Sequence, residues 1–387
     1  MSHRRADSTL RKNMSRLQLE PLERREVLSS LPLSAPLPVP ASLTSQYQLV
    51  ATIRLPGNPL TSFDISYVDS TTHRLYFADR SNASVDIIDT RTNTFLGRVG
   101  GFVGLPPGGK ELGGPNGVVA VGNNEVWASD GDSTIKVIKL NADRTGGKVV
   151  QTISTGGKYR VDELAYDPRD HLVAAVNNND SPPFVSLIST NPNNRHIVAQ
   201  LSITNATGGL EQPLWDPGLG KFLVSVPELN GYSSYNAIAE IDPRTFTVTY
   251  LPLNGLQPSG LVLGPKQELL VSNNDGGIAA GLPARSEIIS AFDGHVIATI
   301  PQVAGADEEW YNPGDNHYYE AALAQPGGGV LGIIDAKTHA WIQNVPTSSG
   351  SQSVAADSSN NAIFVALPAS ASDPQGGIGV YQAVLHG

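Results

Sequence analysis

The sequence predicts an all-β protein, a seven-bladed β-propeller, and three observations lead to that fold. A short apolar run recurs seven times, and the last residues of successive runs lie 45 to 51 positions apart. A period of that size, with several short strands per unit, is typical of propeller blades. Glycine (39) and proline (28) are abundant and only 16% of residues are charged, which suits short strands joined by tight turns. The third observation is an apolar run at 48–55, which precedes the first copy and has no partner strand in it.

The repeated runs are expected to be the second strands of the blades. They are 75–79, 126–130, 173–177, 222–226, 269–273, 318–322 and 363–367. Aligned on the turn before each run, the blades span about 61–105, 114–156, 159–203, 208–255, 257–303, 305–347 and 350–384. Large side chains in these runs, such as Tyr76 and Trp127, are expected to pack between blades.

The seventh copy ends after its third run, 378–382, which is five residues from the end of the sequence. The unpaired run 48–55 precedes the first copy and supplies the missing strand. An open stack of blades would leave two sheet edges with unpaired backbone groups. We therefore expect an N-terminal strand to complete the last blade and close the ring, which gives a monomeric propeller over 46–387.

Residues 1–45 are expected to be a disordered, basic and proline-rich tether outside the ring. Within this segment, RLQLEPLERREVLSS at 16–30 contains LEPLE, then Arg24, then VLS at 27–29. This stretch resembles the LEPR-type sorting motif of large exported and surface-associated bacterial proteins. The resemblance implies export, with a periplasmic or cell-surface location.

Composition excludes several classes of function. The chain has no cysteine, so it has no thiol nucleophile and no thiolate metal site. Beyond residue 26 it carries 19 basic and 32 acidic side chains, a net charge of −13, which makes nucleic-acid binding improbable. No apolar stretch approaches the roughly 20 residues that span a bilayer. No nucleotide or haem motif is present.

A column of polar residues precedes the seven first strands, five positions before each turn. Its members are Asp64, Asn116, Asp162, Glu211, Ser259, Asp307 and Gln352. They are expected to form a ring around one mouth of the central channel. Converging carboxylates repel one another unless a cation neutralises them. Oxygen ligands favour Ca²⁺, Mg²⁺ or Mn²⁺, so one divalent cation is a possible cofactor, although a wet channel mouth explains the column equally well.

Loops after the second strands are expected around the same mouth. They contain Asp130, Asn177 and Asn273, whose types suit both tight turns and a polar ligand site. Together with Asp64, Ser259 and Gln352 they form the expected ligand-binding set.

Two resemblances bear on function. The repeat, with VDIIDTRTNT at 85–94 and IAEIDPRTFT at 238–247, resembles YVTN/lactonase-like propellers over 47–384, which implies the fold above all. EQPLWD at 211–216, PNG at 115–117 and VDEL at 161–164 resemble inner-strand motifs of gluconolactonase and senescence-marker propellers. That family's pattern implies Glu211, Asn116 and Asp162 as metal ligands. Its members are six-bladed, however, and their glutamate opens the first blade rather than the fourth.

Two functions follow from these observations. In the first, an exported propeller binds a polar small molecule or a partner protein at the acidic mouth, without catalysis. In the second, the protein is a metal-dependent lactone hydrolase, with Asp162 or Asp307 as general base. The sequence favours the binding function and leaves enzymatic activity, and the identity of the ligand, open.

Overall fold

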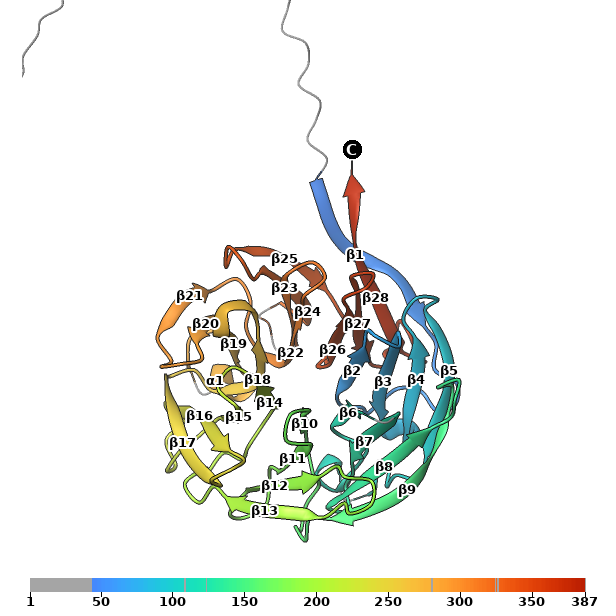
Figure 1. Ribbon diagram of the computed structural model, residues 1–387. Helices are drawn as coiled ribbons and strands as arrows, with labels where there is room; N and C mark the ends of the chain where they lie inside the picture. The colour runs from blue at the N-terminus through green and yellow to red at the C-terminus, as the bar shows by residue number, and fades with distance from the viewer. Residues whose placement is uncertain are drawn as a thin grey trace, which may run out of the picture. The chain divides into compact units, whose positions relative to one another are not determined.

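The computed structural model describes residues 44–386, apart from 108, 123, 280, 324 and 326. In this part of the chain, 28 strands form seven four-stranded antiparallel sheets. The sheets follow one another around a ring, and the first strand of each contacts the first strand of the next, the seventh contacting the first (Figure 1). The structure is therefore the predicted seven-bladed propeller. The expected tether and sorting motif, apart from residues 44 and 45, lie outside the described residues.

Each blade runs from an inner first strand to an outer fourth strand. Blade one contains β2 (Ser66–Asp69), β3 (Arg74–Asp79), β4 (Ser84–Asp89) and β5 (Thr94–Gly100). Blade two contains β6 (Val118–Val121), β7 (Glu125–Ser129), β8 (Thr134–Leu140) and β9 (Gly147–Ser154). Blade three contains β10 (Leu164–Asp167), β11 (Leu172–Asn177), β12 (Phe184–Ser189) and β13 (Ile197–Ser202). Blade four contains β14 (Pro213–Asp216), β15 (Lys221–Val226), β16 (Tyr235–Asp242) and β17 (Thr247–Asn254).

The remaining blades repeat this order. Blade five contains β18 (Pro258–Leu263), β19 (Glu268–Asn273), β20 (Ser286–Ser290) and β21 (Val296–Ile300). Blade six contains β22 (Ala306–Asn312), β23 (His317–Ala322), β24 (Val330–Asp335) and β25 (Trp341–Pro346). Blade seven contains β26 (Val354–Asp357), β27 (Ala362–Leu367), β28 (Gly377–His386) and β1 (Thr44–Ile53).

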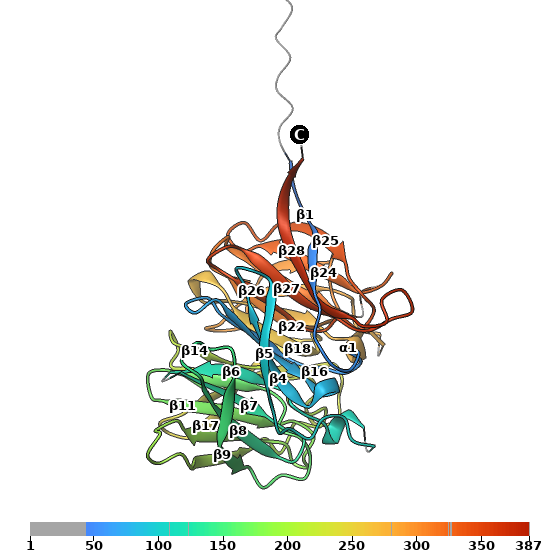
Figure 2. The same ribbon diagram turned by 90° about the vertical axis from the view of Figure 1, so that its right-hand side faces the viewer.

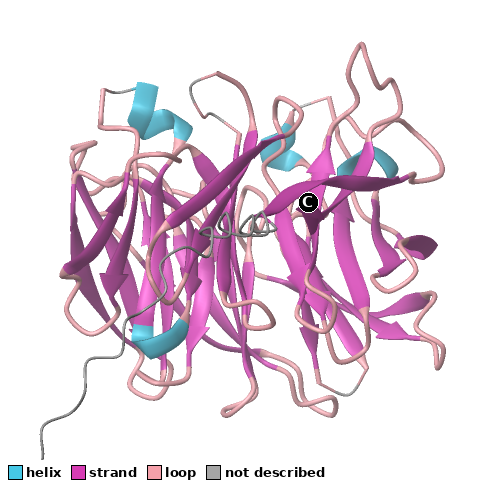
Figure 3. Ribbon diagram, turned by 90° about the horizontal axis from the view of Figure 1, so that it is seen from above, coloured by secondary structure: helices cyan, strands magenta, loops and turns pink. Residues whose placement is uncertain are grey.

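Among the described residues, helical structure is confined to short turns in the loops (Figure 3). These are η1 (Arg80–Asn82), η2 (Lys110–Leu112), η3 (Pro265–Gln267) and α1 (Asp275–Ala279). None of the described helices has the length and apolar character needed to cross a membrane.

The core lies between blades because each second strand is buried on both faces. Side chains alternate along a strand, so neighbouring residues face different blades. Leu75 and Phe77 of β3 pack with Phe364 of blade seven, whereas Tyr76, between them, packs with Val126 of blade two. This explains why the second strands read as continuous apolar runs. The expected inter-blade packing of Tyr76 and Trp127 is confirmed, since both are fully buried.

Four of the first strands end in turns that an aspartate side chain stabilises. Asp69, Asp167, Asp216 and Asp357 close their strands, and the carboxylate of each accepts the backbone N–H two residues ahead, at 2.8–3.0 Å. Aspartate favours such turns because its short side chain reaches its own backbone. These turns define the turn face of the ring, and the opposite face carries the channel mouth.

The ring closes as the sequence predicted, by pairing of β1 with β28. The register joins Thr44 to His386 and Ile53 to Ile378, with an irregularity between Leu49 and Ala51. The far end of this pair extends from the ring as a ribbon (Figures 1 and 2). Blade six holds the edge of the ribbon, because the Gln343 amide accepts the backbone N–H of residue 47 at 2.9 Å and donates to its carbonyl at 3.0 Å. That contact satisfies backbone groups that an edge strand would otherwise expose.

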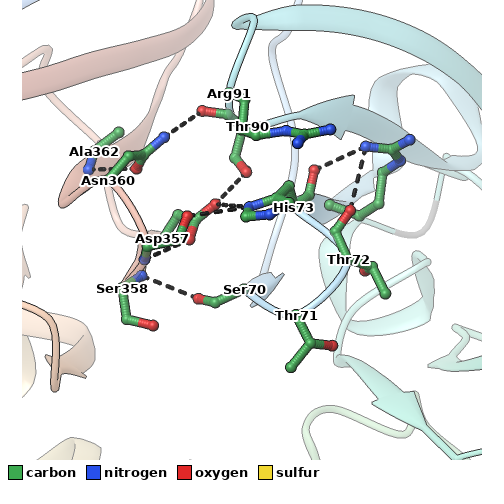
Figure 4. A network of polar contacts seen from close by, with 12 residues as sticks. Ser70, Thr71, Thr72, His73, Thr90, Arg91, Asp357, Ser358, Asn360 and Ala362 are labelled. Carbon is green, nitrogen blue, oxygen red and sulfur yellow. Dashed lines mark hydrogen bonds and ion pairs between the residues drawn. The ribbon is translucent and has the colours of Figure 1, made fainter.

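Polar contacts on the turn face strengthen the seam between blades seven and one (Figure 4). The buried Asp357 carboxylate accepts hydrogen bonds from the Thr90 hydroxyl and contacts His73 Nδ1 at 3.3 Å. The Ser358 N–H donates to the Ser70 hydroxyl at 3.0 Å, and the Asn360 amide donates to the Thr90 carbonyl at 2.9 Å. The seam that closes the ring is thus bonded at its inner strands as well as through β1.

Deleting residues 1–56 is expected to open the ring, because β28 loses its outer partner and the seam loses the apolar contacts of Ile53 and Leu55. The matched control is deletion of residues 1–42, which leaves every strand intact. Thermal unfolding and light scattering should show a lower or broadened transition and self-association for the longer deletion only. A cooperative, monomeric product with an unchanged melting temperature would contradict this closure.

Candidate functional site

The polar column is positioned by a backbone contact that recurs in the first four blades. The backbone N–H of each column residue donates to a carbonyl near the end of the second strand in the same blade. The pairs are Asp64 to Ala78 (2.9 Å), Asn116 to Ser129 (3.1 Å), Asp162 to Val176 (2.7 Å) and Glu211 to Ser225 (3.0 Å). Because the first strands converge on the axis, this contact brings the side chains to one mouth.

The mouth contains a cavity of about 150 Å³ whose lining residues are all polar. They are Asp64, Arg80, Lys110, Arg160, Asp162, Glu163, Glu211, Ser259, Asn274, Asp307 and Gln352. Six of the seven column residues line it, as the alignment of the repeats predicted. Asn116 is the exception, since its side chain is fully buried beneath the mouth.

Arg80 is the central cation of the mouth, and sequence reasoning missed it. This buried guanidinium forms an ion pair with Asp64 and donates to Asn116 Oδ1 and to the Phe63 carbonyl, both at 2.8 Å. Burial lowers the pKa of Arg80, although the Asp64 carboxylate opposes that effect. The Gln352 amide completes the group by donating to Asp64 at 2.9 Å.

A second buried guanidinium, that of Arg160, lies beside the column residue of blade three. Arg160 contacts Asp162 at 3.0 Å, and the Asn178 amide also donates to that carboxylate. Burial alone would lower the pKa of Arg160, but the Asp162 and Asp64 carboxylates outweigh it and hold the pKa above its usual range. Burial raises the pKa of Asp162, while Arg160 opposes the rise.

Two further carboxyl groups at the mouth lack such a partner. Within the described part of the chain, no donor forms a hydrogen bond to the side chain of Glu163 or Glu211. Burial raises the pKa of Glu211 well above its ordinary value, and the neighbouring Asp162 and Asp307 raise it further. Burial and Asp162 do the same to Glu163. Glu211 retains some exposed surface although protein atoms surround it, because its carboxyl group faces the narrow channel.

Asp307, Glu308 and Glu309 are consecutive acids that point in three directions from β22. The strand is irregular between Ala306 and Glu308, and Asp307 lines the mouth at that irregularity. Glu308 turns toward blade seven, where its carboxylate accepts the Val354 N–H at 3.0 Å. Glu309 turns toward blade five, where its Oε2 lies against Gly260.

Three expected ligand-binding residues lie one position away from the mouth. Asp130 is fully buried and accepts from Lys136. Asn177 donates to the Ser133 hydroxyl at 2.9 Å, and Asn273 donates to the Pro283 carbonyl at 2.6 Å, so each holds its own loop.

The residues that do reach the mouth from these loops follow directly in sequence. Asn178 contacts Asp162, Asn274 lines the cavity, and Arg80 follows Asp79 in the same way. In blades one, three and five, the residue that reaches the mouth is therefore the first one after the second run.

Two of the three proposed metal ligands, Asn116 and Asp162, already contact guanidinium groups of the protein; the third is Glu211. Asn116 Oδ1 accepts from Arg80, and Asp162 pairs with Arg160. Among the described residues, no group of three or more histidine, cysteine, aspartate or glutamate side chains could hold a metal ion. This donor set, as arranged, does not fit a divalent cation. Hydrolysis with Asp162 or Asp307 as base stays an untested prediction.

A larger cleft of about 530 Å³ adjoins the mouth on the same face. It is lined by loops 178–183 and 204–209, with Asn178, Asp180, Thr204 and Thr207 among its polar groups. Asn178 belongs to both sites, because it lines the cleft and donates to Asp162 at the mouth. The loops that line the cleft belong to blades three and four.

Comparison with known proteins supports the fold. No protein-family model matches the chain, and no curated protein matches it. Solved structures that resemble it include the WD40 repeats of RRP9 (TM-score 0.65, 10% identity, 88% of this chain and 100% of that chain). Kuenenia stuttgartiensis hydrazine synthase (0.62, 14%, 85% and 96%) and a chain of a Mitotic Checkpoint Complex (0.61, 11%, 92% and 98%) are also similar. At these identities the likeness establishes a propeller fold.

Arg80→Met is expected to destabilise the ring by about 3–5 kcal/mol, because it leaves Asp64 and Asn116 buried without their cation. The matched control is Arg244→Met, which breaks an exposed ion pair with Asp170 and should cost about 0–1 kcal/mol. Urea unfolding of both variants measures the difference. Equal, small losses would show that Arg80 is not the charge that holds the mouth together.

Proposed function

We propose that the protein is a binding module whose channel mouth receives the cationic group of a polar ligand or of a partner protein's side chain. The carboxyl group of Glu211 supports this proposal most directly. It faces a wholly polar cavity, and none of the described residues donates a hydrogen bond to it. A lysine ammonium or an arginine guanidinium would supply both the charge and the donors that this group lacks.

Charge balance favours a cation over an anion. Five carboxyl groups line the mouth (Asp64, Asp162, Glu163, Glu211 and Asp307), against three basic groups (Arg80, Lys110 and Arg160). The raised pKa values of Glu163 and Glu211 reflect burial beside other carboxylates. A bound cation stabilises the ionised form of such groups, so the electrostatic free energy of the mouth falls when a cation enters.

Size favours a ligand that inserts one end. A cavity of about 150 Å³ is large enough for the end of one side chain and leaves little room for water beside it. The adjoining cleft of about 530 Å³ can take the rest of the ligand, where hydroxyl and amide groups offer hydrogen bonds. A peptide segment with one basic residue has this shape. The structural neighbour from a Mitotic Checkpoint Complex is, by its description, part of a protein assembly, which is in keeping with a protein partner.

The proposal is tested with blocked pentapeptides that differ only in a central arginine, lysine or citrulline. Calorimetry should detect binding of the arginine and lysine peptides and not of the citrulline peptide. Glu211→Gln should weaken binding at least tenfold, since one charged contact is worth roughly 1.4 kcal/mol or more. Glu240→Gln breaks an ion pair between β16 and Lys221 of β15, outside the lining of the mouth; it is the control and should bind like the wild type.

The pH dependence of the same binding gives a second measurement. A proton on Glu211 competes with the ligand, so affinity should rise with pH and binding should release protons, which calorimetry in two buffers counts. Glu211→Gln should reduce that release. Absence of binding at millimolar peptide, or equal affinity for arginine and citrulline, would reject the proposal.

Export is a separate part of the proposal and depends on the motif at residues 16–30. Deleting that stretch from the full chain should leave the protein inside a bacterial host that exports the intact chain. Cell fractionation and surface labelling measure this, and the 1–15 deletion serves as the control. Equal export of both deletions would show that the motif is not a sorting signal.

A further inference from the structure

Glu309 and Glu320 form a buried carboxyl pair away from the mouth cavity. They lie directly opposite each other on β22 and β23, with 1% and 0% of their surface exposed. Residues so paired have Cβ atoms about 4.5–5.5 Å apart, and like charges there are destabilising. In the described structure, all four carboxyl oxygens lack a hydrogen-bond partner. Two ionised groups in this position would be very costly.

The pair faces the inner strands of blade five. A methyl group on Gly260 of β18 would lie 1.8 Å from Glu309 Oε2, so the carboxyl group sits against that backbone. Ser272 and Ser286 lie opposite each other on β19 and β20, on the side that packs against blade six. Their hydroxyls donate to the carbonyls of Asn273 (3.2 Å) and Val303 (3.1 Å). Ser286 and the Ser272 backbone also lie close enough to the pair to lower the pKa values of Glu320 and Glu309, but burial outweighs both effects.

Comparison of the seven blades shows that Glu320 departs from the residue type of its position in the repeat. The third residue of the second run is apolar in the other six blades, where it is Phe77, Ala128, Ala175, Val224, Val271 or Val365. The position of Glu309 is likewise uncharged elsewhere, with Ser66, Val118, Leu164, Pro213, Leu261 or Val354. An apolar pair would therefore fill this seam as it does in five of the other six blades, blade one having Ser66 opposite Phe77. Both acids fall in one blade and face each other, which indicates a specific property rather than a requirement of the fold.

We propose that Glu309 and Glu320 hold a shared proton and make the seam between blades five and six pH-sensitive. A proton between the two carboxyl groups converts repulsion into a hydrogen bond, and its loss leaves two buried negative charges. Burial raises the pKa of Glu320 from 4.5 to about 7, and burial with the Glu320 charge raises that of Glu309 well above its usual range. The folded protein then binds more protons than the unfolded chain, so stability falls as the pH rises from 4.5 through about 7.

Other charged groups on the surrounding elements reinforce this direction or are engaged elsewhere. Asp307 and Glu308 precede the pair on β22, and both raise the pKa of Glu309. The remaining charged groups on β19, β20, β23 and β24 lie at strand ends or on other faces. Glu268 contacts His339 at 2.8 Å, Arg285 contacts Glu287 at 2.6 Å, His317 contacts the Tyr47 hydroxyl at 2.8 Å, and Asp335 caps the turn after β24.

The test is the melting temperature of metal-free full-length protein between pH 5.5 and 8.5. The wild type should lose roughly 3–5 °C more than Glu320→Val, which restores the residue type of the other blades. Glu320→Gln and Glu309→Gln should flatten the pH dependence to a similar extent, and the double variant should add little, because either change removes the pair. Glu240→Gln, outside the seam, should keep the wild-type slope. Glu320→Gln keeps the proposal testable if the valine variant does not fold.

Amide hydrogen exchange locates the effect. At pH 8.5, β19 and β22 should exchange faster in the wild type than in Glu320→Val, whereas at pH 5.5 the two proteins should match. Equal pH slopes in wild type and all variants would overturn the proposal. It would also be overturned if added Ca²⁺ abolished the wild-type slope and chelation restored it, since the pair would then hold a cation in place of a proton. Neither measurement involves a ligand, so the outcome is independent of binding at the mouth.

Discussion

Pairing of β1 with β28 is the contact on which the rest of the ring depends. It joins segments more than 320 positions apart, and the two sheet edges that it removes would otherwise invite association with other chains. Closure also fixes the geometry of the channel. Seven inner strands must begin around one axis, and whatever side chains precede them are forced together. The channel mouth is therefore a consequence of closure before it is a binding site.

The carboxylates that converge on that axis repel one another, and arginines of the protein neutralise part of their charge. Arg80 and Arg160 each pair with the nearest aspartate, Asp64 and Asp162, so that half of the mouth is neutralised internally. Guanidinium suits this position because it stays charged when buried and presents several donors in a fixed plane. Glu211, at the start of the next blade, accepts no hydrogen bond from any described residue. This difference is the observation on which the proposed binding of a cationic group rests.

The sequence predicted the ring, its closure and the polar column because all three follow from periodicity. A strand buried on both faces must be apolar throughout, and a repeat of about fifty residues makes the column visible without any structure. What periodicity misses is which side chains meet across blades. Arg80 follows Asp79 in a helical turn, and nothing in its local pattern reveals that it reaches Asn116 in the next blade. Asn177 and Asn273 were expected at the mouth, but Asn178 and Asn274 face it instead, because a step of one residue in extended chain reverses the direction of a side chain.

Departures from the repeat therefore carry information that the repeat itself does not. Where six blades place an apolar residue and one places an acid, the fold does not require the acid, and its burial costs free energy that packing alone would not. Glu320 meets this description, and its partner Glu309 lies on the strand that also carries Asp307 to the mouth. One strand thus bears an acid directed at the ligand cavity, one bonded to blade seven and one paired inside the seam with blade five. If both proposals hold, protonation of the buried pair and occupancy of the mouth would act on the same strand, and β22 would be the element that links pH to binding.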